Sequence, residues 1–166
     1  MSHPITPPST RRDFDFLFGD WTVRHRRLDR RLVGETEWTA FEGRSVARPI
    51  LGGLGNVDEN VVGLPTGPYE AMTLRLFDED TKRWSIWWID GRFAGVDSPM
   101  RGGFADGVGT FYGDDTHDGI PVLVRFVWDV SDPDEPRWEQ AFSTDGGATW
   151  ELNWAMRFER VSGSAL

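Results

Sequence analysis

Hydrophobic and polar residues alternate with a period of two along most of the chain from residue 20 onward. This period places successive side chains on opposite faces of a β-strand. Short clusters rich in Gly, Pro, Asp and Ser interrupt the alternation, and such clusters mark turns. The pattern predicts strands over 20–28, 36–47, 56–62, 70–77, 83–90, 100–112, 121–130, 137–143 and 149–159, the sixth broken by its glycines.

Strands joined by short turns, with almost no helix between them, indicate an all-β fold. A sandwich and an up-and-down barrel both satisfy the pattern. Consecutive hairpins favour the barrel, because a flat sheet of this length would leave two exposed edges. We therefore predict an antiparallel up-and-down barrel of about 8–10 strands.

A short helix is predicted just before the first strand. Thr10 can cap its N-terminus, and Asp13, at the third position, partly imitates a capping box. Phe14, Leu17 and Phe18 share one face at helical spacing. We expect this segment to form a helical plug at one end of the barrel.

The chain has 166 residues, the length of a single domain. It shows no internal repeat, linker or low-complexity segment. We expect a flexible N-terminal arm over 1–12, a single barrel domain over 13–160 and a C-terminal tail over 161–166. Nine Trp and 11 Phe exceed what a minimal core requires, so we expect either a thick aromatic core or an aromatic-lined cavity.

The alternation also assigns faces, on the assumption that the apolar residues of each strand point inward. In the strand over 70–77, the residues assigned to the interior are Met72, Leu74 and Leu76, and those assigned to the exterior are Thr73 and Arg75. In two later strands the residues assigned to the interior are Trp150, Leu152, Trp154, Met156 and Phe158, and Trp138, Gln140 and Phe142.

His25 lies in the first predicted strand, on the same side as Trp21 and Val23. That parity directs its ring into the barrel, with Arg27 next along the same face. Three interpretations stay open: a core histidine satisfied by a neighbour, a hydrogen-bond donor to a ligand, or a general base.

Other polar side chains have a parity that brings them inside, among them Glu59 and Asp90. Arg125 is ambiguous because both faces of its strand are largely apolar. It points either outward beside Asp129 or inward, where it would need a carboxylate partner or the acid group of a ligand. The complete set of predicted ligand-binding residues is Trp21, His25, Glu59, Trp88, Tyr112, Arg125, Gln140 and Trp154.

Four short motifs occur together between residues 13 and 160. They are Gly19-Asp20-Trp21 at the start of the first strand, Leu51-Gly52-Gly53 after the second, Asp78 with Trp84, and Asp145-Gly146-Gly147 followed by Thr149-Trp150. As a set they resemble a bacterial group of lipocalin-like proteins of uncharacterised function in the calycin superfamily. The resemblance implies a closed barrel with a small-molecule cavity and does not imply a reaction.

The same resemblance bears on the class of ligand. Fatty-acid-binding calycins use interior arginines for carboxylates, which makes an acidic ligand an open alternative. Haem-binding calycins use a histidine late in the chain, and no histidine follows His117 here. We therefore predict no cofactor, with haem at His25 as the remaining alternative.

Residues 143–150 read Ser-Thr-Asp-Gly-Gly-Ala-Thr-Trp, which matches the Asp-box pattern of sialidase propellers. Asp145 can accept backbone N–H groups in a hairpin turn, and Trp150 can pack beneath it. A propeller needs several copies at a fixed period, and the chain has one. The segment therefore predicts a hairpin and no glycosidase activity.

The composition excludes several function classes. The chain has no Cys, which rules out disulfides, thiolate nucleophiles and cysteine-ligated metals. Its three His are too few for a multi-histidine metal site, so no metal is predicted. A net charge of −9 argues against nucleic acid and anionic membranes as partners. Because no segment resembles a membrane span or a signal peptide, a cytoplasmic protein is expected.

These features favour a binding protein over an enzyme. The first hypothesis is a monomeric or homodimeric barrel that binds one small hydrophobic molecule. The second is an enzyme on the same barrel, in which His25 transfers protons together with Asp90 or Glu59. The third is an interaction module, because Trp38 and Trp87 fall on the face opposite the expected core.

Overall fold

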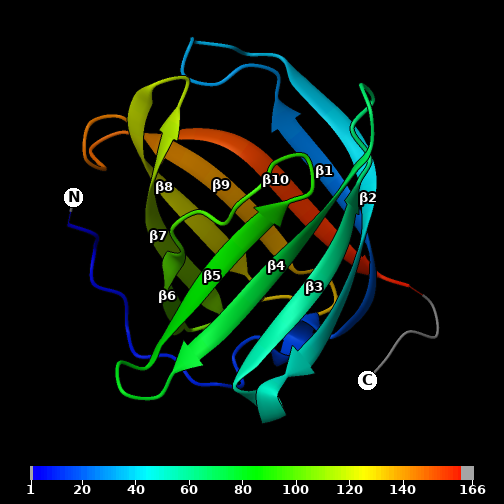
Figure 1. The fold of residues 1–166 in the computed structure, drawn as a ribbon, viewed down its shortest axis with the longest axis vertical. Coiled ribbons are helices and arrows are strands. Elements are labelled where there is room, and N and C mark those ends of the chain that lie inside the picture. Colours follow the sequence, from blue (N-terminus) through cyan, green and yellow to red (C-terminus); the bar gives the residue numbers. More distant parts are fainter. Residues whose placement is uncertain (1, 162–166) are drawn as a thin grey trace.

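Ten antiparallel strands form one closed barrel in the computed structural model, which describes residues 2–161 (Figure 1). The strands are β1 (Gly19–Leu28), β2 (Trp38–Ile50), β3 (Gly55–Val62), β4 (Tyr69–Asp78), β5 (Arg83–Asp90), β6 (Met100–Ala105), β7 (Val108–His117), β8 (Ile120–Asp129), β9 (Arg137–Ser143) and β10 (Glu151–Arg160). Two short 3-10 helices are η1 (Asp15–Leu17) and η2 (Leu51–Gly53).

Each strand pairs with the next along the chain, and β1 closes the barrel by pairing with β10. The closing pair sets Trp21 opposite Arg160 and His25 opposite Met156. The predicted all-β fold and its up-and-down topology are therefore confirmed. Every strand has a hydrogen-bonded neighbour on both sides, so the described sheet has no exposed edge.

The single strand predicted over 100–112 is two strands, β6 and β7. Asp106 and Gly107 connect them with φ angles of 52° and 78°. A type I′ hairpin turn requires positive φ at both central residues, and Asp-Gly is a preferred pair for it. Ala105 and Val108 face each other across this turn. The broken strand expected here is thus a tight hairpin, and the number of strands rises from nine to ten.

The N-terminal segment plugs one end of the barrel, as predicted, although its helix is only the single turn η1. The carboxylate of Asp13 accepts hydrogen bonds from the Thr10 backbone N–H at 2.7 Å and from the Thr10 hydroxyl at 2.8 Å. Phe14 is fully buried, and its ring lies edge-on to the rings of Trp84 and Phe104, with both centroids 5.0 Å away. Aromatic packing therefore fills this end, which is the lower end in Figure 1.

Trp21 joins the plug to the first strand. Its indole N–H donates to the backbone carbonyl of Leu17 at 2.7 Å, and its ring lies edge-on to that of Phe158. Trp21 is completely buried. A buried indole that pairs its N–H in this way fixes the plug at a defined height in the barrel.

Part of the N-terminal arm packs against the barrel. The Ser9 N–H donates to the carbonyl of Lys82 at 2.9 Å, and the guanidinium of Arg83 donates to the carbonyl of Thr6. Thr6 and Ser9 are buried. The flexibility of the arm and the limits of the domain remain predictions. Of the tail predicted over 161–166, all but the first residue lie outside the described residues.

The inner face of β4 is the one that carries Thr73 and Arg75, opposite to the face predicted from alternation. Arg75 and Thr73 are 3% and 5% exposed. The residues predicted inside, Met72, Leu74 and Leu76, are only half-buried on the outer face. The predicted assignment for this strand is therefore wrong.

The same reversal on β3 has an identifiable cause. Asp58 is buried on the inner face, and its Oδ2 lies 2.7 Å from Nη2 of Arg75. A charge can be buried where it is paired, so this part of the wall needs no apolar side chains. Glu59, predicted to point inward, is exposed on the outer face.

The faces of β9 and β10 follow the prediction, except at one bulge. Trp138 and Phe142 are buried, and Gln140 is half-buried on the same face. On β10 a register shift between Leu152 and Trp154 marks a β-bulge. The bulge turns Leu152 outward, 39% exposed, and buries its neighbour Asn153 completely.

Candidate functional site

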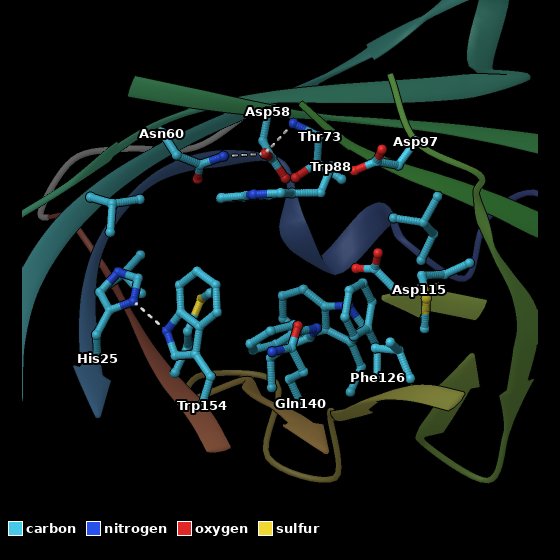
Figure 2. Close-up of a pocket in the computed structure, with 18 of the residues that line it drawn as sticks. His25, Asp58, Asn60, Thr73, Trp88, Asp97, Asp115, Phe126, Gln140 and Trp154 are labelled. Carbon is cyan, nitrogen blue, oxygen red and sulfur yellow. Dashed lines mark hydrogen bonds between the residues drawn. The ribbon is translucent and has the colours of Figure 1, made fainter. Parts of the chain in front are cut away.

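A cavity of about 150 Å³ lies inside the barrel, and Figure 2 shows the side chains around it. Its apolar wall is formed by Val23, Val62, Ile86, Trp88, Met100, Val124, Phe126, Trp128, Trp138, Trp154, Met156 and Phe158. Its polar lining is formed by His25, Asp58, Asn60, Thr73, Asp97, Ser98, Asp114, Asp115 and Gln140. A mainly apolar cavity with a few polar groups is typical of a small-molecule site.

The aromatic rings of the cavity stand nearly perpendicular to one another. The ring of Trp154 makes interplanar angles of 89° with those of Trp88 and Trp138, at centroid distances of 5.9 Å and 5.5 Å. The ring of Phe126 lies 4.9 Å from that of Trp138. Perpendicular rings present both π faces and ring edges to the space between them.

The floor of the cavity is shared with the packed end of the barrel. Trp128 lines the cavity and also lies 5.5 Å, between centroids, from the ring of Phe16 in η1. Trp21, predicted to contact the ligand, lies in the packed end and does not line the cavity. The plug therefore fixes the floor on which a ligand would rest.

His25 is held by an indole on one side and a phenyl ring on the other. Its Nδ1 accepts a hydrogen bond from Nε1 of Trp154 at 3.1 Å, and its ring stacks on Phe41 with centroids 4.7 Å apart. Because an indole N–H can only donate, the neutral ring carries its proton on Nε2. Nε2 has no hydrogen-bond partner within residues 2–161, and it lies so close to Gly43 on β2 that a Cβ at that position would be only 2.9 Å from it.

The environment of His25 keeps its ring neutral. Burial, and to a lesser extent the positive charge of Arg27, lowers the pKa of His25 to about 4. At pH 7 the ring therefore offers one N–H donor and no charge.

A hydrogen-bond network built on Asp58 orients the polar wall. Its Oδ1 accepts from Nδ2 of Asn60 at 2.6 Å and from the backbone N–H of Thr73 at 3.1 Å, while its Oδ2 pairs with Arg75. Arg75 in turn donates to Oδ1 of Asn56 at 2.9 Å. Because Asn60 uses its amide N–H₂ group on Asp58, its amide oxygen is left for the cavity (Figure 2).

Gln140 is oriented in the same way from the opposite wall. Its Nε2 donates to Oδ1 of Asn153 at 2.8 Å, an interaction that depends on the bulge in β10. Its amide oxygen points into the cavity (Figure 2). The two amides thus offer acceptors from opposite sides.

Three carboxylates lie at the rim, where the sheet is least complete. β5 and β6 pair only from Trp84–Ile86 to Met100–Gly102, so the connection over 91–99 covers the upper part of the wall. That connection supplies Asp97, and β7 supplies Asp114 and Asp115. All three are exposed, and no Lys or Arg belongs to the described lining.

Arg125 and Tyr112 lie on the outer face of the barrel. They are opposite each other in the pairing of β7 with β8, and the Arg125 guanidinium lies 4.2 Å from the ring centroid of Trp150. The neighbours of Arg125, Val124 and Phe126, are the β8 residues that line the cavity. The inward position predicted for Tyr112, the inward alternative for Arg125 and the interior assignment of Trp150 are therefore wrong, and Arg125 cannot anchor an acid in the cavity.

Other arginines gather around Tyr69 at the end of the barrel opposite the plug. The Arg92 guanidinium lies 3.7 Å from the ring centroid of Tyr69, and that of Arg27 lies 4.7 Å from the ring centroid of Trp154. Burial lowers the pKa of Arg27, and it lowers the pKa of Arg31 to about 10. None of these three arginines lines the cavity.

The acid–base group predicted for an enzyme is not assembled. The Asp90 carboxylate is bound by the guanidinium of Arg92 at 3.0 Å and 2.8 Å, and Glu59 is on the outer face. His25 bonds only to Trp154 within the part of the chain that the structure describes. The enzyme hypothesis thus lacks a carboxylate within hydrogen-bond reach of the histidine.

Four of the predicted ligand-binding residues share the cavity, namely His25, Trp88, Gln140 and Trp154. The sequence analysis missed Asp58, Asn60, Thr73, Asp97, Ser98, Asp114 and Asp115. A signal for the first two was present, because Asn56, Asp58 and Asn60 form a polar stripe of period two. The rim residues carry no comparable local signal, since they come from a connection and a strand end.

Haem does not fit this cavity. A cavity of about 150 Å³ accommodates a molecule of about the size of benzene, and a porphyrin is several times larger. Because Nδ1 of His25 accepts from Trp154, Nε2 carries the ring proton, and neither nitrogen offers a free lone pair to iron. Among residues 2–161 no three side chains of His, Asp or Glu are grouped to hold a metal ion.

The segment over 143–150 connects β9 to β10 as a tight turn, as predicted. Oδ1 of Asp145 accepts from the Ser143 hydroxyl at 2.7 Å and from the Thr149 N–H at 2.8 Å. Oδ2 of Asp145 also accepts from the Thr149 hydroxyl. This bond, followed by the other two, lowers the pKa of Asp145 to about 2. The Trp150 indole donates to the carbonyl of Gly147 at 3.1 Å.

The two tryptophans proposed for an interaction surface are half-buried on the outer face. The Arg26 guanidinium covers Trp38 at 5.1 Å from the ring centroid.

No helix within residues 2–161 has the length and apolarity needed to span a membrane. In comparisons with known proteins, the chain matches no protein-family model and no curated protein sequence.

Proposed function

We propose that this barrel binds one small, largely apolar molecule in its cavity. The observation that carries the proposal is the lining itself, in which perpendicular aromatic rings meet inward-facing polar atoms of Asn60, Gln140 and His25. Buried polar groups without a protein partner are costly, and a ligand that pairs with them would recover that cost.

The volume of the cavity limits the size of the ligand. A cavity of about 150 Å³ corresponds to a molecule with about one aromatic ring. A fatty acid with a long chain is too large, and no guanidinium lines the cavity to hold its carboxylate. The acidic ligand is therefore not part of the proposal.

Binding is favoured over catalysis because His25 and Asp58 are oriented in the cavity but are already bonded to neighbouring side chains. Its histidine is neutral and is bound to an indole, and the Asp58 carboxylate is paired with Arg75. A closed ten-strand barrel supports placing the chain with the lipocalin-like calycins. That membership, a cytoplasmic location and a monomeric or homodimeric state remain proposals.

The proposal is tested with 4-fluorotoluene, a neutral single-ring probe observed by fluorine NMR. Two neighbouring residues of β3 provide a matched pair, because Val62 lines the cavity and Val61 is 44% exposed on the outer face. We expect the wild-type protein to bind the probe and Val62→Phe to weaken binding by about tenfold or more, since the added ring occupies the cavity. Val61→Phe is expected to bind as the wild type does.

Circular dichroism and thermal melts establish that both variants remain folded. If 4-fluorotoluene fails to bind the folded wild-type protein, or if both variants bind it equally well, the cavity is not a binding site for apolar molecules and the proposal is wrong.

A further inference from the structure

We infer that the ligand is an organic cation, an aromatic ring that carries a protonated or quaternary amine, with its charge held near Asp97 and Asp115. This inference rests on the proposed function, because it assigns a chemical class to the molecule in the same cavity. Three features support it: the charge of the lining, the geometry of the indoles, and the polarity of the inward-facing groups.

The charge of the lining is entirely negative. Carboxylates of Asp97 and Asp115 are directed toward the cavity from the same side in Figure 2. Asp114 also lines the cavity, and its Oδ2 lies 2.9 Å from Nε2 of His3. The one buried carboxylate, that of Asp58, already has a guanidinium partner. A ligand that enters past this rim therefore meets the negative charge of Asp97 and Asp115, which attracts cations and repels anions.

The indoles add a second attraction that acts only on cations. The ring of Trp154 stands at 89° to those of Trp88 and Trp138. The Arg27 guanidinium already lies over the Trp154 ring, whereas the rings of Trp88 and Trp138 have no such cation within the described residues. The π face of an indole carries partial negative charge and binds ammonium groups, and sites of several aromatic rings are typical of quaternary-ammonium recognition. A hydrocarbon ligand would gain contact area from these rings but not this electrostatic term.

The polar atoms that face the cavity are mainly acceptors. Asn60 donates one amide N–H to Asp58 and Gln140 donates one to Asn153, which leaves both amide oxygens directed at the cavity. Ammonium N–H groups are donors with no lone pair, so they complement such a lining. The donors are the hydroxyls of Thr73 and Ser98 and Nε2–H of His25, a ring 4% exposed whose Nε2 has no partner in the described chain. These donors suit a hydroxyl or carbonyl oxygen elsewhere on the ligand.

The alternative is an anion held by Arg27, Arg31 and Arg92. These guanidiniums gather near the cavity but do not line it, and Arg92 is already bound to Asp90. An anionic probe therefore belongs in the same experiment, where its preferred binding would overturn the inference.

Three probes of similar size separate charge from shape: 4-fluorobenzylammonium, 4-fluorobenzyl alcohol and 4-fluorobenzoate, each titrated by fluorine NMR at low and high salt. We expect the ammonium to bind about tenfold more tightly than the alcohol and the benzoate to bind least. The advantage of the ammonium should shrink as the salt concentration rises, because the rim carboxylates are exposed.

Charge-neutral variants then locate the cation. Asp97→Asn/Asp115→Asn is expected to weaken ammonium binding by about tenfold and to leave alcohol binding unchanged. Asp80→Asn/Asp132→Asn removes the same total charge from two exposed connections that do not line the cavity, and it serves as the matched control.

The outcomes distinguish the two proposals. If neither the three probes nor 4-fluorotoluene binds, the proposed function itself fails. If the alcohol or the benzoate binds as tightly as the ammonium, or if the control variant loses as much affinity as the rim variant, the protein is a ligand-binding barrel but the assignment to cations is wrong.

Discussion

Replacement of Arg75 by alanine is expected to lower the free energy of unfolding by about 3–5 kcal/mol, because it leaves the Asp58 carboxylate buried without its partner. The two side chains are 4% exposed, and their charged atoms are 2.7 Å apart. The Arg75 guanidinium also lies 5.0 Å from the ring centroid of Phe14, so the same change removes a contact with the plug. Urea denaturation at pH 7 measures the loss.

The control for this experiment is Arg48→Ala. Arg48 is exposed on the outer side of β2, and its loss should change the free energy of unfolding by about 0.5 kcal/mol or less. The double variant Asp58→Asn/Arg75→Met removes both charges and should recover most of the stability lost in Arg75→Ala. A loss of less than about 1 kcal/mol in Arg75→Ala would show that the pair is not desolvated as the structure indicates.

The second large effect is a loss of stability in mild acid that depends on His25. An unfolded histidine has a pKa of about 6.5, whereas the folded pKa of His25 is about 4. Between these values the unfolded chain binds a proton that the folded protein does not, so lowering the pH favours unfolding. The contribution of His25 to the free energy of unfolding is fully present above pH 6.5 and is lost as the pH drops. The loss from this group alone reaches about 3 kcal/mol by pH 4.

Comparison with His25→Gln isolates this contribution, since carboxylates titrate in both proteins. The free energy of unfolding is measured at intervals from pH 7.5 to 4. The wild type should lose about 3 kcal/mol more than the variant over this range, whatever the offset between them at pH 7.5. His117→Gln removes a histidine outside the cavity lining and should retain the wild-type profile. Parallel profiles for wild type and His25→Gln would contradict the buried, neutral ring.

Most of the fold follows from local patterns in the sequence. Alternation locates the strands, and turn residues separate them, because both signals arise from neighbouring residues. The turn at Asp106-Gly107 was missed even though Asp-Gly is a strong hairpin signal, because glycines on both sides of it suggested one irregular strand. The faces of β9 and β10 were assigned well, apart from the bulge, because their large aromatic residues share one face.

The candidate site was only partly predictable, for a physical reason. The prediction placed apolar residues inside because an unpaired charge is costly to bury. Asp58 can be buried because it pairs with Arg75, which lies 17 positions later in the next strand. Such a pair inverts the expected faces of both strands at once. The outward position of Arg125 could not be predicted either. Both faces of its strand are largely apolar, so alternation does not show which face points inward.

The pairing of β1 with β10 also has a consequence for how the chain is made. These strands begin and end the barrel, so the chain emerging from the ribosome has β1 without one neighbour until β10 is synthesised. During that interval the backbone groups of β1 and β9 are open to strands of another nascent chain, which is a route to domain swapping or aggregation. Docking of the last strand removes both hazards in one event.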